Sequence, residues 1–158
     1  MVAVQTRILI VVDGGDSVAA PDKELARAVA RIYFSIRHAD LEPVLACEGG
    51  GFPIVAADMR RFAKDPGIAP FLQDPVARSE IADTLPIEHI IVEDFDAAVF
   101  FPSEGDRLGA ALALKQTFLE TGKPIAILES WSLAKLPRKF VIISSPTCDV
   151  TWLDKLLR

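Results

Sequence analysis

Short, continuous runs of apolar residues recur along the chain, and each is ended by a cluster rich in Gly, Ser, Asp or Pro. The first run, residues 7–12 (RILIVV), is apolar after its first position and stops at DGGD. A strand of a parallel sheet is buried on both faces and shows this pattern, whereas a half-buried strand alternates polar and apolar residues. We therefore predict five short buried strands, at residues 7–12, 43–47, 96–101, 124–128 and 140–145.

Between these runs, apolar residues recur at spacings of three and four, which predicts helices. Pro21 and Asp22 are favoured at a helix start, and one apolar stripe follows them, made by Leu25, Val29, Ile32 and Ile36. A second helix is expected to run to Thr121 and to end at Gly122; its predicted inner face consists of Leu108, Leu112, Phe118 and Leu119. The last residues, CDVTWLDKLLR, predict a closing helix.

The segment 52–88 differs from the rest because it is rich in Pro and Asp. Two short helices are expected in it, from about Pro66 to Leu72 and from about Pro75 to Thr84, since proline is favoured at the first helical position. A connection of this length is either a functional cap or a structural excursion over one side of the sheet. Both interpretations remain open at the level of sequence.

The alternation of strands and helices predicts the α/β class, with a mostly parallel sheet between two layers of helices. The chain shows no internal repeat or obvious linker, so a single domain over residues 1–158 is expected, with 52–88 as an inserted cap-like segment. In such folds ligands bind outside the carboxyl ends of the strands. The turns expected there are DGGD, CEGGG, PSEGD, ESW and SSPT.

Composition and charge argue against some classes of partner and indicate a cellular compartment. The chain has 158 residues and a formal net charge of −5, without a basic run, which argues against nucleic acid as a partner. The longest apolar run near the start is too short to cross a membrane and lacks the features of a signal peptide. The two cysteines, Cys47 and Cys148, form no disulfide framework, so the reducing cytoplasm is the expected compartment.

No motif for a cofactor or a metal is present. The turns DGGDSV and CEGGGF lack the G-x-G-x-x-G order and the G-K-[ST] ending of phosphate-binding loops, and no G-x-S-x-G occurs. Neither cysteine nor either histidine has metal-ligand spacing. We therefore expect no cofactor and no metal site.

One long stretch, DPGIAPFLQDPVARSEIADTLPIEHIIVEDFDAAVFFPSEG, resembles the ThiJ/PfpI superfamily, in the branch of the heat-shock chaperone/glyoxalase III proteins. That branch has a D-P-x-V-x-x-F-L-x-D run, then T-x-P-L, then D-Y-D-A-V-F-F-P-G-G-H-G, and later G-K-P, which Gly122, Lys123 and Pro124 match. The resemblance covers residues 7–136. It implies a flavodoxin-like three-layer sandwich and a nucleophile elbow directly after the G-K-P strand.

At this elbow the resemblance aligns the nucleophilic cysteine with Glu129, the adjacent histidine with Ser130 and a glycine with Trp131. A carboxylate is no replacement for a thiolate as a nucleophile at a carbonyl carbon. The resemblance therefore implies a site whose position is retained and whose cysteine chemistry is lost. Glu129 is interpreted as a non-catalytic replacement, as a general base, or as one ligand of a hard cation.

Two further features follow from the resemblance. The branch forms an oxyanion site with backbone N–H groups in a turn that corresponds here to Ser103, Glu104 and Gly105, where a carboxylate opposes a developing negative charge. A helix glutamate supports the cysteine in the branch. Ungapped counting places Ala28 at that position, and Glu24, one helical turn earlier, serves only if the helix start shifts.

These observations predict a non-catalytic domain that binds a small molecule or a protein, with a stress-related or chaperone-like role implied by resemblance alone. The alternative is a glyoxalase- or amidase/hydrolase-like enzyme that uses Glu129 as a base or Cys47 as a thiol. Cys47 lies at the predicted site edge, and its other interpretation is a small buried residue. A homodimer is expected, because exposed sheet edges favour self-association and the resemblance implies dimers.

Overall fold

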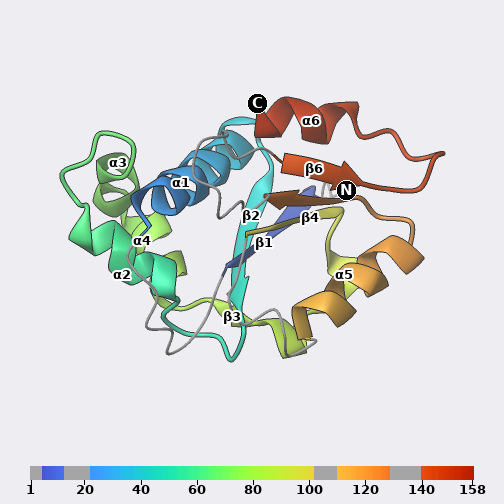
Figure 1. Cartoon of the computed structure of the whole chain (residues 1–158), viewed down its shortest axis with the longest axis horizontal. Helices are drawn as coiled ribbons and strands as arrows, with labels where there is room; N and C mark the ends of the chain where they lie inside the picture. Colours follow the sequence, from blue (N-terminus) through green and yellow to red (C-terminus); the bar gives the residue numbers. More distant parts are fainter. Residues whose placement is uncertain (1–4, 13–21, 102–109, 129–139) are drawn as a thin grey trace.

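The computed structural model of the chain describes residues 5–12, 22–101, 110–128 and 140–158. These residues form a six-stranded sheet at the centre of the molecule, with strand order β3-β2-β1-β4-β5-β6 (Figure 1). The strands are β1 (Arg7–Val12), β2 (Glu42–Cys47), β3 (Leu85–Pro86), β4 (Ala97–Phe100), β5 (Ile125–Leu128) and β6 (Phe140–Ile143). All five predicted strands are present, and the two-residue β3 was not predicted.

The sheet is parallel except at one edge. Strand β1 pairs in parallel with β2 on one side and with β4 on the other, and β4 pairs in parallel with β5. The edge strand β6 runs antiparallel to β5. The chain adds β2 on one side of β1 and later adds β4 and β5 on the other side. This change in the order of the strands also occurs in flavodoxin-like folds. The predicted α/β class with a mostly parallel sheet is confirmed.

Two apolar clusters lie on opposite faces of the sheet and make it the middle of three layers. Ile8, Ile10 and Val99 face the cluster that contains α1 (Lys23–His38), α2 (Ile54–Arg61) and α6 (Thr151–Leu157). Leu9 and Val11 face the cluster that contains α5 (Ala110–Glu120). Alternate residues of β1 therefore enter different clusters and are buried on both sides, which is why the strand is a continuous apolar run.

Helix α1 forms as its sequence predicts. The N-cap residue Asp22 accepts a hydrogen bond from the backbone N–H of Leu25 at 2.9 Å, which satisfies a donor that the first turn leaves without a partner. Val29, Ile32 and Ile36 are buried against the sheet, as the stripe predicts, whereas Leu25 is only partly buried. Tyr33 extends the buried face of α1.

Helix α5 shows one correct and one wrong prediction. Gly122 follows it with φ +78°, a conformation that favours glycine, and its N–H donates to the carbonyl of Leu119 at 3.1 Å. Of the predicted inner face, Phe118 is buried and Leu119 is partly buried, whereas the Leu112 side chain is 53% exposed and Leu108 lies outside the described residues. Leu114, which was not predicted there, is buried as well. Helix α5 has apolar residues around most of its circumference, so the spacing alone does not select its buried side.

The segment 52–88 contains three helices among the described residues: α2, α3 (Ala69–Gln73) and α4 (Pro75–Ala82). The start of α4 is as predicted, with Asp74 accepting hydrogen bonds from the N–H groups of Val76 and Ala77, each at 3.0 Å. Helix α2 was not predicted, and α3 begins later than expected, at Ala69. The reason is a turn before α3, in which Gly67 N–H donates to the Asp65 carboxylate at 2.9 Å.

This segment packs on α1 and on one face of the sheet. Buried apolar residues from each of its helices belong to the same cluster as the buried face of α1. Later in the sequence, the short helices η1 (Ile87–His89) and η2 (Val92–Asp94) contribute Ile87 and Val92 to the cluster on the opposite face of the sheet. Among the described helices, none combines the length and the apolar character needed to cross a membrane.

Candidate functional site

The parallel strands all end on the same side of the sheet, and this side is called the carboxyl edge. The strand register places Val12 beside Cys47, Val11 beside Phe100, and Phe100 beside Ile127. Strands β1, β2, β4 and β5 therefore finish at almost the same level. The order of the sheet reverses between β1 and β4, and ligands of open α/β sheets bind at the carboxyl ends beside such a reversal.

Most of the predicted site residues follow these strands in sequence but lie outside the described residues. Glu129, Ser130 and Trp131 come directly after β5, which ends at Leu128, and the residues Ser103, Glu104 and Gly105 come shortly after β4. Their roles stay predictions. The described chain confirms the element that precedes each group: a buried strand that ends at the carboxyl edge.

Cys47 is the predicted site residue that the structure describes best. It is the last residue of β2, its side chain is fully buried, and its Sγ lies 2.9 Å from Thr84 Oγ1. The Thr84 hydroxyl donates its single hydrogen to the Gly51 carbonyl at 2.8 Å, so in the Cys47–Thr84 contact the thiol is the donor. A cysteine nucleophile must reach its substrate, and a fully buried side chain in this position does not.

The glycine-rich turn after β2 is a tight structural turn. Gly49, Gly50 and Gly51 have φ of +74°, +71° and +80°, a region that L side chains rarely adopt. All three N–H groups have protein acceptors: Gly49 donates to the Glu88 carboxylate at 3.3 Å, Gly50 to the Cys47 carbonyl at 3.0 Å and Gly51 to the Thr84 carbonyl at 3.0 Å. A bound phosphate would have to displace these acceptors.

Glu24, the other candidate in the described chain, lies on the surface. Its side chain is 67% exposed and pairs with Arg27 Nη1 at 2.6 Å, one turn along α1. Arg27 also holds Asp65 through two hydrogen bonds, of which Nε to Oδ1 measures 2.9 Å. These contacts place Glu24 in an ion-pair network that joins the start of α1 to the turn before α3. Ala28, at the position found by ungapped counting, is partly buried.

The Arg27–Asp65 contact leads us to predict how the stability of the fold changes at low pH. Hydrogen bonds from Arg27 lower the pKa of Asp65 to about 2, below the ordinary value of 3.8. The folded state therefore binds this proton more weakly than the unfolded chain, so Asp65 stabilises the fold above about pH 4 and loses that effect as the pH falls toward about 2. In urea unfolding, the stability difference between the wild type and Asp65→Asn should shrink as the pH falls from about 5 to about 2.

The matched control for this experiment is Asp83→Asn, because Asp83 is exposed and has no ion pair within the described ranges. Its stability difference from the wild type should not change over the same pH range. A constant difference for Asp65→Asn would contradict the role assigned to the Arg27 contact.

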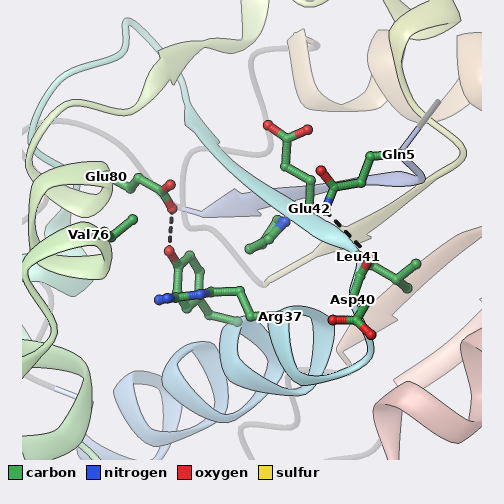
Figure 2. A pocket seen from close by; sticks show the side chains of 9 residues that line it. Gln5, Arg37, Asp40, Leu41, Glu42, Val76 and Glu80 are labelled. Carbon is green, nitrogen blue, oxygen red and sulfur yellow. Dashed lines mark hydrogen bonds between the residues drawn. The ribbon is translucent and has the colours of Figure 1, made fainter. Parts of the chain in front are cut away.

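A polar pocket of about 260 Å³ lies at the opposite, amino-terminal edge of the sheet, between the end of α1, the start of β2 and α4 (Figure 2). The buried phenol of Tyr33 donates to the Glu80 carboxylate, and burial followed by this contact raises the pKa of Tyr33. Arg37 is paired with Asp74 at 3.1 Å. These contacts connect α1 to α4, so Tyr33, Arg37 and Glu80 have a structural role in this pocket.

The expected absence of a metal site stays a prediction. Within the described ranges, no group of three or more His, Cys, Asp or Glu side chains is placed to hold a metal ion. Glu129, which was interpreted as one possible ligand of a hard cation, lies outside those ranges.

Several solved structures resemble the chain, including the following two. The X-ray structure of Francisella tularensis Rapid Encystment Protein 24 KDa (REP24) matches with a TM-score of 0.55 and 16% sequence identity, over 78% of this chain and 58% of that one. The crystallographic structure of APC35852 matches with a TM-score of 0.50 and 21% identity, over 78% of this chain and 56% of that one. The likeness shows a shared mixed α/β fold. At these identities it concerns the fold alone.

The match extends over less than two thirds of either solved chain, so activities of those whole proteins do not transfer directly. No protein-family model matches this chain, and no curated protein matches it.

Sequence reasoning missed the contacts that involve Thr84 and Arg27. Thr84 was expected to end a helix, but it forms a β-bridge with Gly51, and its hydroxyl oxygen accepts a hydrogen bond from the Cys47 thiol. Arg27 lies 38 positions before Asp65, and only the packing of α1 on the following segment brings the two together. The run of three successive glycines was the one available signal that the chain turns back sharply before Thr84.

Proposed function

We propose that the protein is a relative of the heat-shock chaperone/glyoxalase III branch that lacks the cysteine chemistry of that branch and acts as a non-catalytic domain binding a small molecule or a protein. One observation carries the proposal. Strand β5, the counterpart of the strand that precedes the nucleophile elbow, ends at Leu128, and the residue that follows it in the sequence is Glu129 instead of cysteine.

The two cysteines support the same proposal. Cys47 is fully buried at the end of β2, and in the sheet β1 and β4 separate β2 from β5. Cys148 follows β6, which runs antiparallel to β5, and Ile143 of β6 pairs with Ile125 at the amino end of β5. Strand β6 therefore leads away from the carboxyl edge, and neither thiol occupies the expected nucleophile position.

The test is turnover of methylglyoxal by the purified full chain. We expect a rate equal to that of buffer for the wild type and for Glu129→Gln. Turnover by the wild type that is lost in Glu129→Gln would contradict the proposal and would assign a catalytic role to that carboxylate.

Thiol labelling of the native protein tests the alternative that Cys47 is a nucleophile. Cys148 should react first, because it is partly exposed in the turn after β6. Cys47 should react more slowly than a model thiol by on the order of 100-fold, because a buried thiol reacts only after local opening. Fast labelling of Cys47, together with turnover that is lost in Cys47→Ser, would contradict the proposal in favour of a thiol enzyme.

A homodimer is part of the proposal, and the edge strand β6 supports it. Val141 and Ile143 are 36% and 40% exposed on this strand, whose outer backbone groups have no further strand beside them in the described sheet. Exposed apolar edge strands favour pairing with another chain. We expect the wild type to sediment as a dimer and the double variant Val141→Lys/Ile143→Lys as a monomer.

The control for the edge strand is Ile91→Lys, because Ile91 is 59% exposed and lies away from β6, between η1 and η2. This variant should sediment as the wild type does. A monomeric wild type, or a dimer that survives the double substitution, would show that β6 is not the interface.

A further inference from the structure

A cationic pocket of about 360 Å³ lies between the start of α1 and the end of α2, lined by Lys23 and by residues 60–65. Four of the seven residues that line it are cationic: Lys23, Arg60, Arg61 and Lys64. Asp65 supplies the carboxylate of the lining. The chain as a whole carries a net charge of −5, so this concentration of positive charge departs from the rest of the protein.

The carboxylate of Asp65 does not neutralise the pocket, because Arg27 engages both of its oxygens from outside the pocket lining. Lys23 lies at 3.9 Å from Asp65, the limit of an ion pair. Arg60, Arg61 and Lys64 have no carboxylate within 4.0 Å among the described residues. Within the described chain, these three cations therefore remain available to a ligand.

Helix stability explains only part of this arrangement. Arg60 and Arg61 lie in the last turn of α2, where the helix dipole favours cations. Lys23 is the first residue of α1, where the dipole disfavours a cation, and Lys64 lies outside both helices. A solvated helix end would not require these two lysines to border the same pocket as the two arginines.

Aromatic rings hold part of the charge in place without neutralising it. The Lys23 ammonium lies 5.7 Å from the centroid of the Phe62 ring, and the Arg60 guanidinium lies 4.8 Å from that of Phe52. Phe62 is itself part of the pocket lining and is partly buried. The pocket thus combines an apolar surface with a rim of cations.

We propose that the cationic pocket binds a small organic phosphate, with the phosphate group contacted by Arg61 and Lys64 and the organic part lying against Phe62. Guanidinium groups match phosphate oxygens in charge and geometry, and a lysine adds a compact charge. The volume falls within the range of small-molecule sites. This inference goes beyond the proposed function and does not depend on it, since none of the residues that line the pocket belongs to β5 or directly follows it.

The test is a calorimetric titration of the full chain with phenyl phosphate, and with inorganic phosphate as the probe without an organic part. We expect phenyl phosphate to bind at millimolar or lower concentration and more tightly than inorganic phosphate. The double variant Arg61→Gln/Lys64→Gln should weaken binding by about tenfold or more, because two charge-assisted contacts are removed.

The matched control is Arg78→Gln/Lys155→Gln, which removes the same net charge at exposed residues outside the pocket. Its affinity should stay within about twofold of the wild type, since screened charges far from a ligand contribute little. Phe62→Leu should reduce the advantage of phenyl phosphate over inorganic phosphate and leave the binding of inorganic phosphate unchanged.

Three outcomes would overturn the inference: no binding of phenyl phosphate by the folded wild type, equal weakening in the pocket variant and its control, or binding of phosphatidic-acid vesicles in preference to phenyl phosphate. The last would assign the basic surface to a membrane. None of these measurements involves turnover, so the inference and the proposed function fail or hold separately.

Discussion

Replacing Phe71 with alanine is expected to lower the free energy of unfolding by about 3–5 kcal/mol, the usual cost of removing a fully buried phenyl ring. Phe71 is 0% exposed, and its ring meets those of Tyr33 and Phe34 edge to face, with centroid distances of 5.1 and 5.9 Å. Such pairs add stability beyond the buried area. The substitution leaves a cavity at the junction of α1 and α3.

The effect should be large because α3 has only five residues and depends on packing for its stability. Phe71 is its buried residue, and Tyr33 in turn donates to Glu80 of α4. Loss of the ring therefore loosens the attachment of the segment 52–88 to α1. Urea unfolding followed by far-ultraviolet circular dichroism measures the change.

Phe52→Ala is the matched control, since it makes the same chemical change at a side chain that is 43% exposed. Its expected cost is below about 1 kcal/mol. If the two substitutions cost the same, Phe71 does not anchor this segment.

Gly50→Ala is expected to have the second large effect, a loss of about 2–5 kcal/mol in the free energy of unfolding. Gly50 has φ +71°, and a methyl group there would lie 2.9 Å from Pro86 Cγ and 3.0 Å from the Pro86 backbone nitrogen. The cost combines the strain of an L residue in the left-handed region, about 1–2 kcal/mol, with overpacking, typically about 1–3 kcal/mol.

Gly49→Ala separates the two contributions. Gly49 has nearly the same φ, +74°, but a methyl group there would meet no atom within 4 Å. It should therefore show only the cost of the backbone conformation, about 1–2 kcal/mol. The same unfolding measurement applies to both variants, and equal losses would show that the approach of Pro86 adds nothing.

Local signals in the sequence were sufficient where a few neighbouring residues decide the structure. Asp74 and Pro75 begin α4, and Gly122 ends α5 with a positive φ, because caps and glycine conformations depend on the backbone within one turn. The apolar stripe of α1 was also evident in the sequence, because polar and charged residues occupy the opposite side of the helix and so define its buried face. The candidate site was located only as a position, the end of β5, because its chemistry depends on residues outside the described chain.

The sequence by itself determined the α/β class, the five main strands and the absence of cysteine from the position after β5. Tertiary structure alone decided the antiparallel direction of β6, the exposure of Leu112 and the burial of the Cys47 thiol against Thr84. It also decided the cationic pocket, in which Lys23 meets residues 60–65. The physical reason is the same in each case: apolar runs and charges record the preference of each residue for burial or water, whereas strand direction and long-range contacts depend on which segments pack together.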